Sequence, residues 1–263
     1  KLIAIFGVKG GVGTSTIAGL IGYGLSERAG QKTALMDMAY GKSYLPVAFG
    51  LEPVATFAEL ARAATTNDPN ALQRMLLKSG KNLFIVGTGN DRYLDDGIAP
   101  EHIEAIIDRI LSVHPYMVID LSSTAPAVQR LVIARAQKII LVSTPTLSSL
   151  RLARSLINDI KDLKGGNTDT LHLVLNRVGE NQGAEVGRPD IEAALQQKIR
   201  AVLVNDPKLI MTAEAQTKVL GTIKGVEKII DDLLTRLNLT GTGRGDAAQK
   251  SGLLGSLIRK AGA

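Results

Sequence analysis

The sequence predicts an α/β fold: one large domain in which a parallel sheet carries helices on both faces. Short apolar runs alternate with longer amphipathic segments, which is the pattern of repeated strand–helix units. Most of the apolar runs lack polar alternation, as expected for strands that are covered on both sides. A glycine-rich turn, VKGGVGTST, joins the first apolar run to the first amphipathic segment.

Each element follows from its own periodicity. The expected strands are short and rich in aliphatic residues: 1–7, 32–38, 82–88, 116–121, 138–144, 171–177 and 199–204. The expected helices have apolar residues at helical spacing: 14–28, 56–64, 68–79, 100–113, 125–135, 147–163, 189–197 and 225–238. Residues 238–249 are polar and rich in Gly and Thr. We therefore expect one domain over 1–237, a linker over 238–249 and a tail over 250–263.

The composition excludes several classes of function. The absence of cysteine excludes disulfides, thiolate metal sites and cysteine nucleophiles, and fits a reducing cytoplasm. Aromatic residues supply 3% of the chain, which argues against a protein that stacks single-stranded bases. The net charge of +6 favours an anionic partner: a nucleotide, duplex DNA or anionic lipid. The chain begins at Lys1 rather than Met, which is consistent with a preceding region.

The glycine-rich turn has the features of a phosphate-binding loop. Three glycines offer backbone N–H donors with little steric cover: Gly10, Gly11 and Gly13. Ser15 and Thr16 open the following helix, whose N-terminus favours negative charge. The usual loop ends Gly-Lys-Ser/Thr, with the lysine on the outer phosphates and the hydroxyl on Mg²⁺. Here Thr14 stands in the lysine position, so a simple tight turn is the alternative interpretation.

With Lys9 before the paired glycines, the loop resembles the deviant phosphate loop of the ParA/MinD superfamily, Lys-Gly-Gly-x-Gly-Lys-Ser/Thr-Thr. The resemblance covers residues 1–237 and implies a Rossmann-like P-loop NTPase fold that binds ATP and Mg²⁺ as a homodimer. It implies that Lys9 reaches the nucleotide of the partner subunit and that Thr14 replaces the second lysine. It also implies that Asp37, in ALMDM, orients or deprotonates the attacking water. Lys9 and Asp37 are thus the expected catalytic residues.

The same resemblance assigns the remaining site. Asp120, in YMVIDL, matches the carboxylate that supports Mg²⁺, and Ser15 is the other expected metal residue. Asn176 and Arg177, in LVLNR, match the pair whose asparagine reads adenine, and residues 204–220 resemble the segment that packs over the base. A strand-end aspartate often only caps the next helix, but ligands of open α/β sheets bind at these strand ends. The expected nucleotide-binding residues are Lys9, Gly10, Gly11, Val12, Gly13, Thr14, Ser15, Thr16, Asn176 and Arg177.

Departures from the superfamily pattern narrow the expected function. DNA-partition members carry Asp-x-Asp-Pro-Gln after the second strand and prolines after the Mg²⁺ carboxylate; this chain has DMAYG at 37–41 and LSS at 121–123. The stretch GGVGTSTIA looks most like the CpaE/TadZ branch, polar localisation factors of Flp/Tad (type IV, tight-adherence) pilus machines. The expected partners are accordingly a second copy and pilus-assembly proteins. The expected location is cytoplasmic or peripheral at the inner membrane or cell pole.

Replacing the loop lysine predicts at most a slow ATPase. A threonine hydroxyl donates one hydrogen bond but carries no charge, and losing such a contact costs about 2–4 kcal/mol in the transition state. This corresponds to roughly a hundredfold or more in rate. Two alternatives stay open: a DNA-segregation ATPase, favoured by the positive charge, and a nucleotide-independent scaffold.

The tail resembles the membrane-targeting tail of MinD-like proteins. Four aliphatic residues fall on one helical face: Leu253, Leu254, Leu257 and Ile258. Basic residues flank them, as in helices that lie in a membrane interface. An anionic membrane surface or a partner protein is the expected contact. Docking onto the chain's own core and plain disorder are the alternatives.

Overall fold

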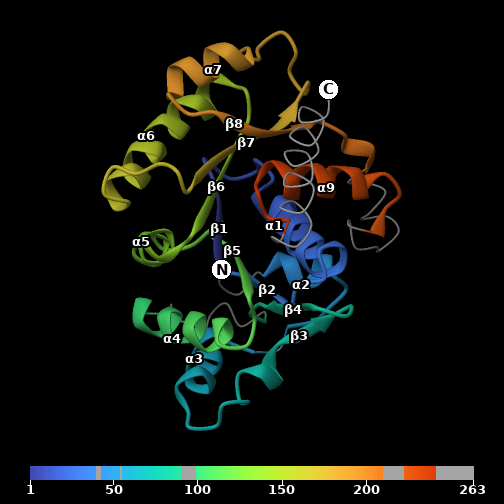
Figure 1. The fold of residues 1–263 in the computed structure, drawn as a ribbon, viewed down its shortest axis with the longest axis vertical. Helices are drawn as coiled ribbons and strands as arrows, with labels where there is room; N and C mark the ends of the chain where they lie inside the picture. The colour runs from blue at the N-terminus through green and yellow to red at the C-terminus, as the bar shows by residue number, and fades with distance from the viewer. Residues whose placement is uncertain (40–42, 54, 90–98, 210–221, 241–263) are drawn as a thin grey trace, which may run out of the picture.

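A computed structural model describes residues 1–39, 43–53, 55–89, 99–209 and 222–240. Its centre is an eight-stranded sheet in the order β3-β4-β2-β5-β1-β6-β7-β8 (Figure 1). The edge strand β3 is antiparallel to β4, and the other neighbouring strands pair in parallel. The predicted α/β fold is confirmed.

All seven expected strands are present, together with β3, which was not expected. The strands are β1 (Leu2–Gly7), β2 (Thr33–Asp37), β3 (Leu77–Ser79), β4 (Leu83–Val86), β5 (Tyr116–Asp120), β6 (Lys138–Ser143), β7 (Leu171–Val178) and β8 (Ile199–Val204). Every residue of β2 and β5 is buried, because helices cover both faces of the sheet there.

The helices form two layers around the sheet. They are α1 (Thr14–Tyr23), α2 (Tyr44–Ala48), α3 (Phe57–Thr65), α4 (Pro100–Leu111), α5 (Pro126–Arg135), α6 (Leu147–Leu163), α7 (Arg188–Leu195) and α9 (Val226–Arg236). Helices α1, α2 and α9 lie on one side of the sheet, and α4, α5 and α6 lie on the other (Figure 1). Helix α3 packs on α4, and α7 packs on α6.

The helix expected over 68–79 is wrong. A bend at 66–67 and turns at 69–72 lead into a short 3₁₀ helix, η2 (Gln73–Met75), and then into β3. The stretch NDPN at 67–70 consists of strong turn formers, and the Asp68 carboxylate accepts from the Asn70 N–H at 2.9 Å. Local turn chemistry therefore overrides the helical spacing of the apolar residues that follow.

The first helix changes geometry after α1, where a π-helical turn, η1 (Gly24–Arg28), replaces the expected α-helical continuation. A Cβ on Gly24 would lie 2.5 Å from Cγ2 of Ile230, so the glycine allows α9 to pack closely on η1. Leu237 and Leu239 are also buried, which brings the core two residues past the boundary expected at 237. The expected tail, with most of the expected linker, lies outside the described residues.

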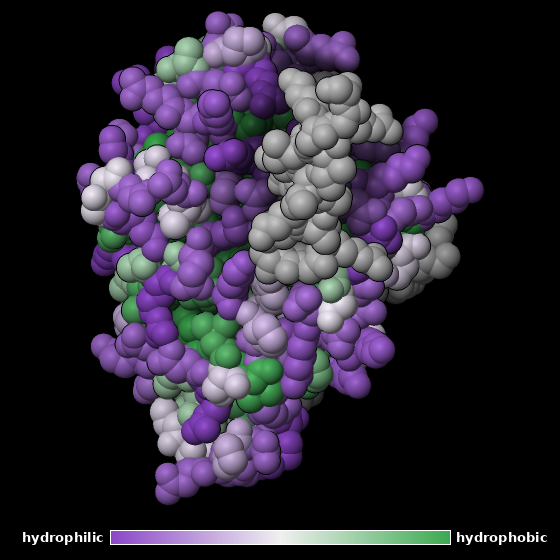
Figure 2. All heavy atoms as spheres, viewed as in Figure 1, coloured by the Kyte–Doolittle hydropathy of each residue, from purple (hydrophilic) through white to green (hydrophobic). Residues whose placement is uncertain are grey.

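Hydrophilic side chains cover most of the face in Figure 2, and hydrophobic side chains gather in a smaller area of its lower half. None of the helices in the described ranges combines the length and apolar character that crossing a bilayer requires.

Candidate functional site

The loop between β1 and α1 lies at the carboxyl ends of the parallel strands, the edge at which open α/β sheets bind ligands. Gly11 and Gly13 have φ of 79° and 91°, values that favour glycine. Gly13 is also the N-cap of α1 and provides no side chain to cap the helix. The first amide donors of α1 are therefore available to an anion.

A cavity of about 660 Å³ opens over this loop. Its lining comes from the loop itself, from α2 and from the segment after β5, and includes Lys9, Ser15, Tyr44, Ser122 and Ser123. The volume falls in the range of small-molecule sites, about 300–1,000 Å³. We refer to this cavity as the phosphate cavity.

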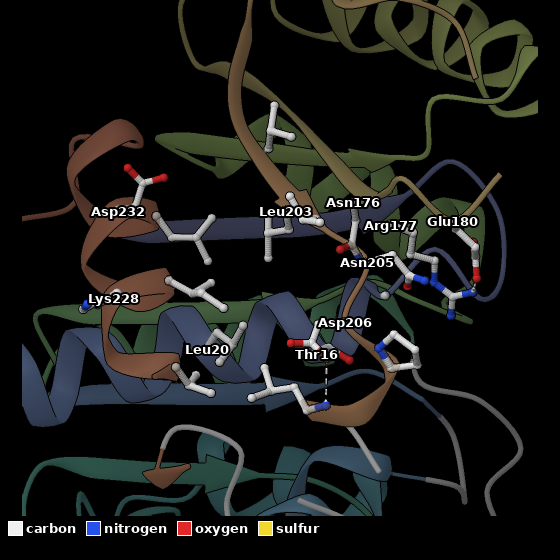
Figure 3. Close-up of a pocket in the computed structure, with 18 residues that line it drawn as sticks. Thr16, Leu20, Asn176, Arg177, Glu180, Leu203, Asn205, Asp206, Lys228 and Asp232 are labelled. Carbon is white, nitrogen blue, oxygen red and sulfur yellow. Dashed lines mark hydrogen bonds and ion pairs between the residues drawn. The ribbon is translucent and has the colours of Figure 1, made fainter. Parts of the chain in front are cut away.

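A second cavity of about 700 Å³ lies beside the first and shares Gly13, Thr16 and Arg177 with it (Figure 3). Segments of α1, α9 and the chain after β8 enclose it. Much of the lining is apolar, and the group includes Leu20, Val202, Leu203, Val204, Leu209, Val226, Ile229 and Leu233. An apolar cavity beside an anion-binding loop fits a planar base attached to phosphates, and we refer to it as the base cavity.

Asp120 is fully buried and lines neither cavity, but it bonds to Ser122, which lines the phosphate cavity. Its Oδ1 accepts from the Ser122 backbone N–H at 2.9 Å and from the Ser122 hydroxyl at 2.6 Å. Its Oδ2 is buried and has no hydrogen-bond partner in the described structure, a costly state for a carboxylate oxygen. Ser15 Oγ lies 3.2 Å from Ser122 Oγ, so the two expected metal residues are joined through Ser122. This arrangement of oxygens fits Mg²⁺.

The described residues contain no cluster of three His, Cys, Asp or Glu side chains that could hold a metal ion. Mg²⁺ usually takes most of its ligands from phosphates and water and only one or two from carboxylates.

Asp37 lies beside Asp120, at the matching register of the neighbouring strand. Its carboxylate is buried and accepts backbone bonds from Ala39 N–H and from Leu45 N–H, each at 2.9 Å, and a further backbone bond from Tyr44. Burial raises the pKa of Asp37 from 3.8 to about 6, and the nearby Asp120 adds to the rise, while the backbone bonds oppose it. Within the described ranges, Asp37 organises the chain after β2 and does not line either cavity. Its expected role toward water stays a prediction.

Lys9 and Thr14 differ in where their side chains lie. Lys9 is exposed, and its Nζ lies 3.4 Å from Oγ of Ser148 at the start of α6. Thr14 is buried, and a Cβ on Gly7 would lie 2.2 Å from its hydroxyl oxygen. The Thr14 hydroxyl is thus folded back against the end of β1. That Lys9 serves a partner subunit stays a prediction.

Asn176 and Arg177 line the base cavity (Figure 3), and Arg177 also lines the phosphate cavity. The Asn176 side chain donates from Nδ2 to the carbonyl of Val12, within the phosphate loop, at 2.8 Å. Arg177 has a φ of 57° and pairs with Glu180 at 3.4 Å. A left-handed backbone at a non-glycine residue costs on the order of 1–3 kcal/mol and is concentrated at functional sites. Ser123, on the other side of the phosphate cavity, has a φ of 60° and shares this strain.

Several lining residues were not expected from the sequence. Ser122 was noted as a departure, but its bond to Asp120 was not anticipated. Lys228, Ile229 and Asp232 come from α9, more than 200 residues from the loop, and no motif marks them. Of the segment expected over the base, residues 204–207 and 209 line the base cavity. Residues 210–220 lie outside the described ranges.

Comparison with known proteins identifies the family. The family model described as cellulose biosynthesis protein BcsQ matches residues 1–168. This chain belongs to the BcsQ family. The BcsQ-family chain is 27% identical over 219 residues to the septum site-determining protein MinD of Synechocystis sp., covering 81% of this chain and 79% of that one. It is 24% identical over 243 residues to MinD of Thermotoga maritima, covering 90% and 88%.

Solved structures show the same fold. A ParA family ATPase from Chlorobium tepidum matches with a TM-score of 0.78 and 20% identity, covering 88% of this chain and 97% of that one. MinD from Pyrococcus horikoshii, solved with Mg-ADP, matches with a TM-score of 0.73 and 17% identity, covering 93% and 97%. A variant of Cyanothece McdA, solved with ATP, matches with a TM-score of 0.66 and 17% identity, covering 90% of this chain and 96% of that one. The BcsQ-family chain thus has the fold of these ParA- and MinD-type proteins. Together with the family model and the two MinD relatives, this confirms the resemblance to the ParA/MinD superfamily.

Proposed function

We propose that this chain is an ATP-binding localisation factor that dimerises around ATP and Mg²⁺ and hydrolyses ATP to ADP and phosphate slowly. The residues proposed to hold phosphate are the loop residues Lys9 to Thr16. Ser15, Ser122 and Asp120 would hold Mg²⁺, which when bound neutralises charge on the phosphates. The base would lie among Leu20, Val204 and Ile229, beside Asn176.

The observation that carries the slow-hydrolysis proposal is Thr14. It replaces a charged side chain with a hydroxyl that is folded back against Gly7. The backbone donors of the loop and the orphaned oxygen of Asp120 are retained, so the site keeps groups that bind and lacks one that stabilises transferring charge. Lys9 from a second subunit would restore part of this charge, which would link binding to dimerisation.

This proposal is tested by measuring nucleotide affinity, ATP turnover and molecular mass. The measurements compare the parent with Lys9→Ala, Thr14→Lys and Thr14→Gln. We expect Thr14→Lys to raise turnover by roughly a hundredfold, the inverse of a loss of about 2–4 kcal/mol. Thr14→Gln, which is longer but uncharged, is the matched control and should not. Lys9→Ala should weaken the ATP-dependent dimer. A parent without ATP affinity at millimolar concentration rejects the binding proposal, and fast parental turnover rejects slow hydrolysis alone.

We propose that the complex positioned by this chain is a Flp/Tad pilus complex, because GGVGTSTIA resembles the CpaE/TadZ branch. The BcsQ family match favours a second candidate, the positioning of a cellulose-secreting complex. Deletion of the gene, followed by electron microscopy of surface pili and dye staining of cellulose, separates the two. Loss of pili with normal cellulose supports the first candidate, and the reverse supports the second.

Two further outcomes are distinguished by binding assays. A mobility shift with duplex DNA, with and without ATP and titrated in salt, would reveal a DNA-segregation ATPase. A dimer whose mass is indifferent to ATP would instead indicate a nucleotide-independent scaffold. For the tail, anionic liposomes and a truncation at Asn238 test membrane contact. Equal binding by both chains would remove the tail from the proposal.

A further inference from the structure

Asn176 is a physical link between the two cavities. It follows the buried part of β7 and lines the base cavity, yet its side chain bonds to Val12 in the phosphate loop, 164 residues earlier. The contact is close as well as polar: a Cβ on Gly13 would lie 2.2 Å from Asn176 Nδ2. The loop and the end of β7 therefore fit together at this point without space for one added carbon.

The amide group has more bonding capacity than this contact uses. An asparagine side chain carries two N–H donors and one carbonyl acceptor. One donor is used on the Val12 carbonyl. Within the described ranges, the second donor and the oxygen make no further hydrogen bond, and Asn176 lines the base cavity, so it has the capacity to bond base and loop at the same time.

We infer that Asn176 is a positioning residue for the phosphate loop, in addition to any contact with the base. It fixes the Val12 carbonyl and thereby the course of the loop into Gly13, the N-cap of α1. Base occupancy would then hold Asn176 in place and strengthen phosphate binding, so the two cavities are coupled. This inference rests on the proposed nucleotide function, because it deepens the role of that site.

A first experiment uses the protein without nucleotide. Hydrogen–deuterium exchange of peptides covering residues 8–16 is compared in the parent, Asn176→Asp, Asn176→Ala and Asn205→Ala. Asp has nearly the same volume as Asn but replaces the donor with an acceptor, so it breaks the bond to Val12 without creating a cavity. Asn205 lines the base cavity, and its backbone N–H bonds to Val178 rather than to the loop, which makes Asn205→Ala the matched control. Both Asn176 variants should exchange about threefold to tenfold faster in the loop, as expected for losing one net hydrogen bond.

A second experiment compares affinity for ATP with affinity for inorganic tripolyphosphate, which has no base. Asn176→Asp and Asn176→Ala should weaken both ligands by about threefold to tenfold. Asn205→Ala should weaken ATP alone. Unchanged loop exchange, or tripolyphosphate affinity equal to the parent's in Asn176→Ala, overturns the inference. If the parent binds neither ligand, the proposed function fails, and the exchange experiment still decides whether Asn176 holds the loop.

Discussion

The phosphate cavity and the base cavity are neighbours of similar volume, but they are built differently. The lining of the phosphate cavity includes the backbone amides and hydroxyls of the loop and the strained Ser123 beside some apolar side chains, with Asp37 and Asp120 buried nearby. The base cavity is formed largely by aliphatic side chains from segments far apart in the chain. The effects of substitutions in or near the phosphate cavity should therefore depend on pH, Mg²⁺ and backbone strain. The effects of substitutions in the base cavity should depend on the apolar area that is buried.

The largest expected effect is the contribution of Asp37 to stability. Burial raises its pKa from 3.8 to about 6. Between these values the folded protein keeps a proton that the unfolded chain has released, so raising the pH through about 4 to 6 lowers the free energy of unfolding. The stabilisation is fully present below pH 3.8 and lost above about 6, a change of about 3 kcal/mol at about 1.4 kcal/mol per pKa unit.

Urea unfolding between about pH 4 and 7 measures this slope in the parent and in Asp37→Asn, which cannot titrate. Between about pH 4 and 6, the free energy of unfolding of Asp37→Asn should fall by about 3 kcal/mol less than that of the parent. Asp169→Asn, at an exposed carboxyl, is the control and should follow the parent. Parallel curves for the parent and Asp37→Asn would show that Asp37 does not titrate in this range.

The next effect is expected at Gly13, where the two cavities meet. Gly13→Ala places a methyl group against Asn176 in a backbone with a φ of 91°. The strain, about 1–3 kcal/mol, should move the loop and weaken ATP binding by about fivefold to 150-fold in calorimetric titration. Gly183→Ala is the matched control, because its Cβ would meet nothing within 4 Å and its φ is outside the left-handed region. Equal affinity of the two variants would contradict the expected role of Gly13.

A smaller effect is expected at Ser122. Ser122→Ala removes the hydroxyl between Ser15 and Asp120, a net loss of about 0.5–1.5 kcal/mol. ATP affinity should fall when Mg²⁺ is present and match the parent's when EDTA is present. A similar loss in both conditions would show that Ser122 acts on the loop rather than on the metal site.

The smallest effect is expected in the base cavity, at Val204. Its side chain is 72% exposed and lines the base cavity, so a base that covers it would bury apolar area. Val204→Ala removes two methyl groups, and a fully buried CH₂ contributes about 0.8 kcal/mol. Because a base would cover these groups only in part, ATP binding should weaken by about 1 kcal/mol or less. The loss should be the same for ATP and ADP and independent of Mg²⁺. Val113→Ala, outside both cavities, should bind like the parent; a Mg²⁺-dependent loss at Val204 would undo the contrast between the cavities.

The two cavities also differ in how well the sequence predicts them. The phosphate loop is contiguous, and each glycine or hydroxyl in it has a local chemical reason, so its residues could be named in advance. The contributions of α9 could not be named in advance, because Ile229 and Asp232 are ordinary helix residues until packing brings them to the base cavity. Asn176 falls between these cases: its position was predictable from the resemblance, but its bond to Val12 depends on tertiary contact.

The sequence predicted the central strands of the sheet better than the edge strand β3. Continuous apolar runs mark the central strands in the sequence. β3 has only three residues, Leu-Lys-Ser, two of which are polar, and so lacks this pattern. The turn formers at 67–70 compete with the helical spacing of the apolar residues after them, and the turn chemistry prevails in the fold.

The short strand β3 also bears on how the protein behaves at high concentration. A sheet edge exposes unpaired N–H and C=O groups that can join another sheet, and proteins limit this with short edge strands and lysines. β3 has both features, since Lys78 is its central residue and is exposed. This end of the sheet therefore offers little edge for a second sheet to join, even where the concentration of the chain is high.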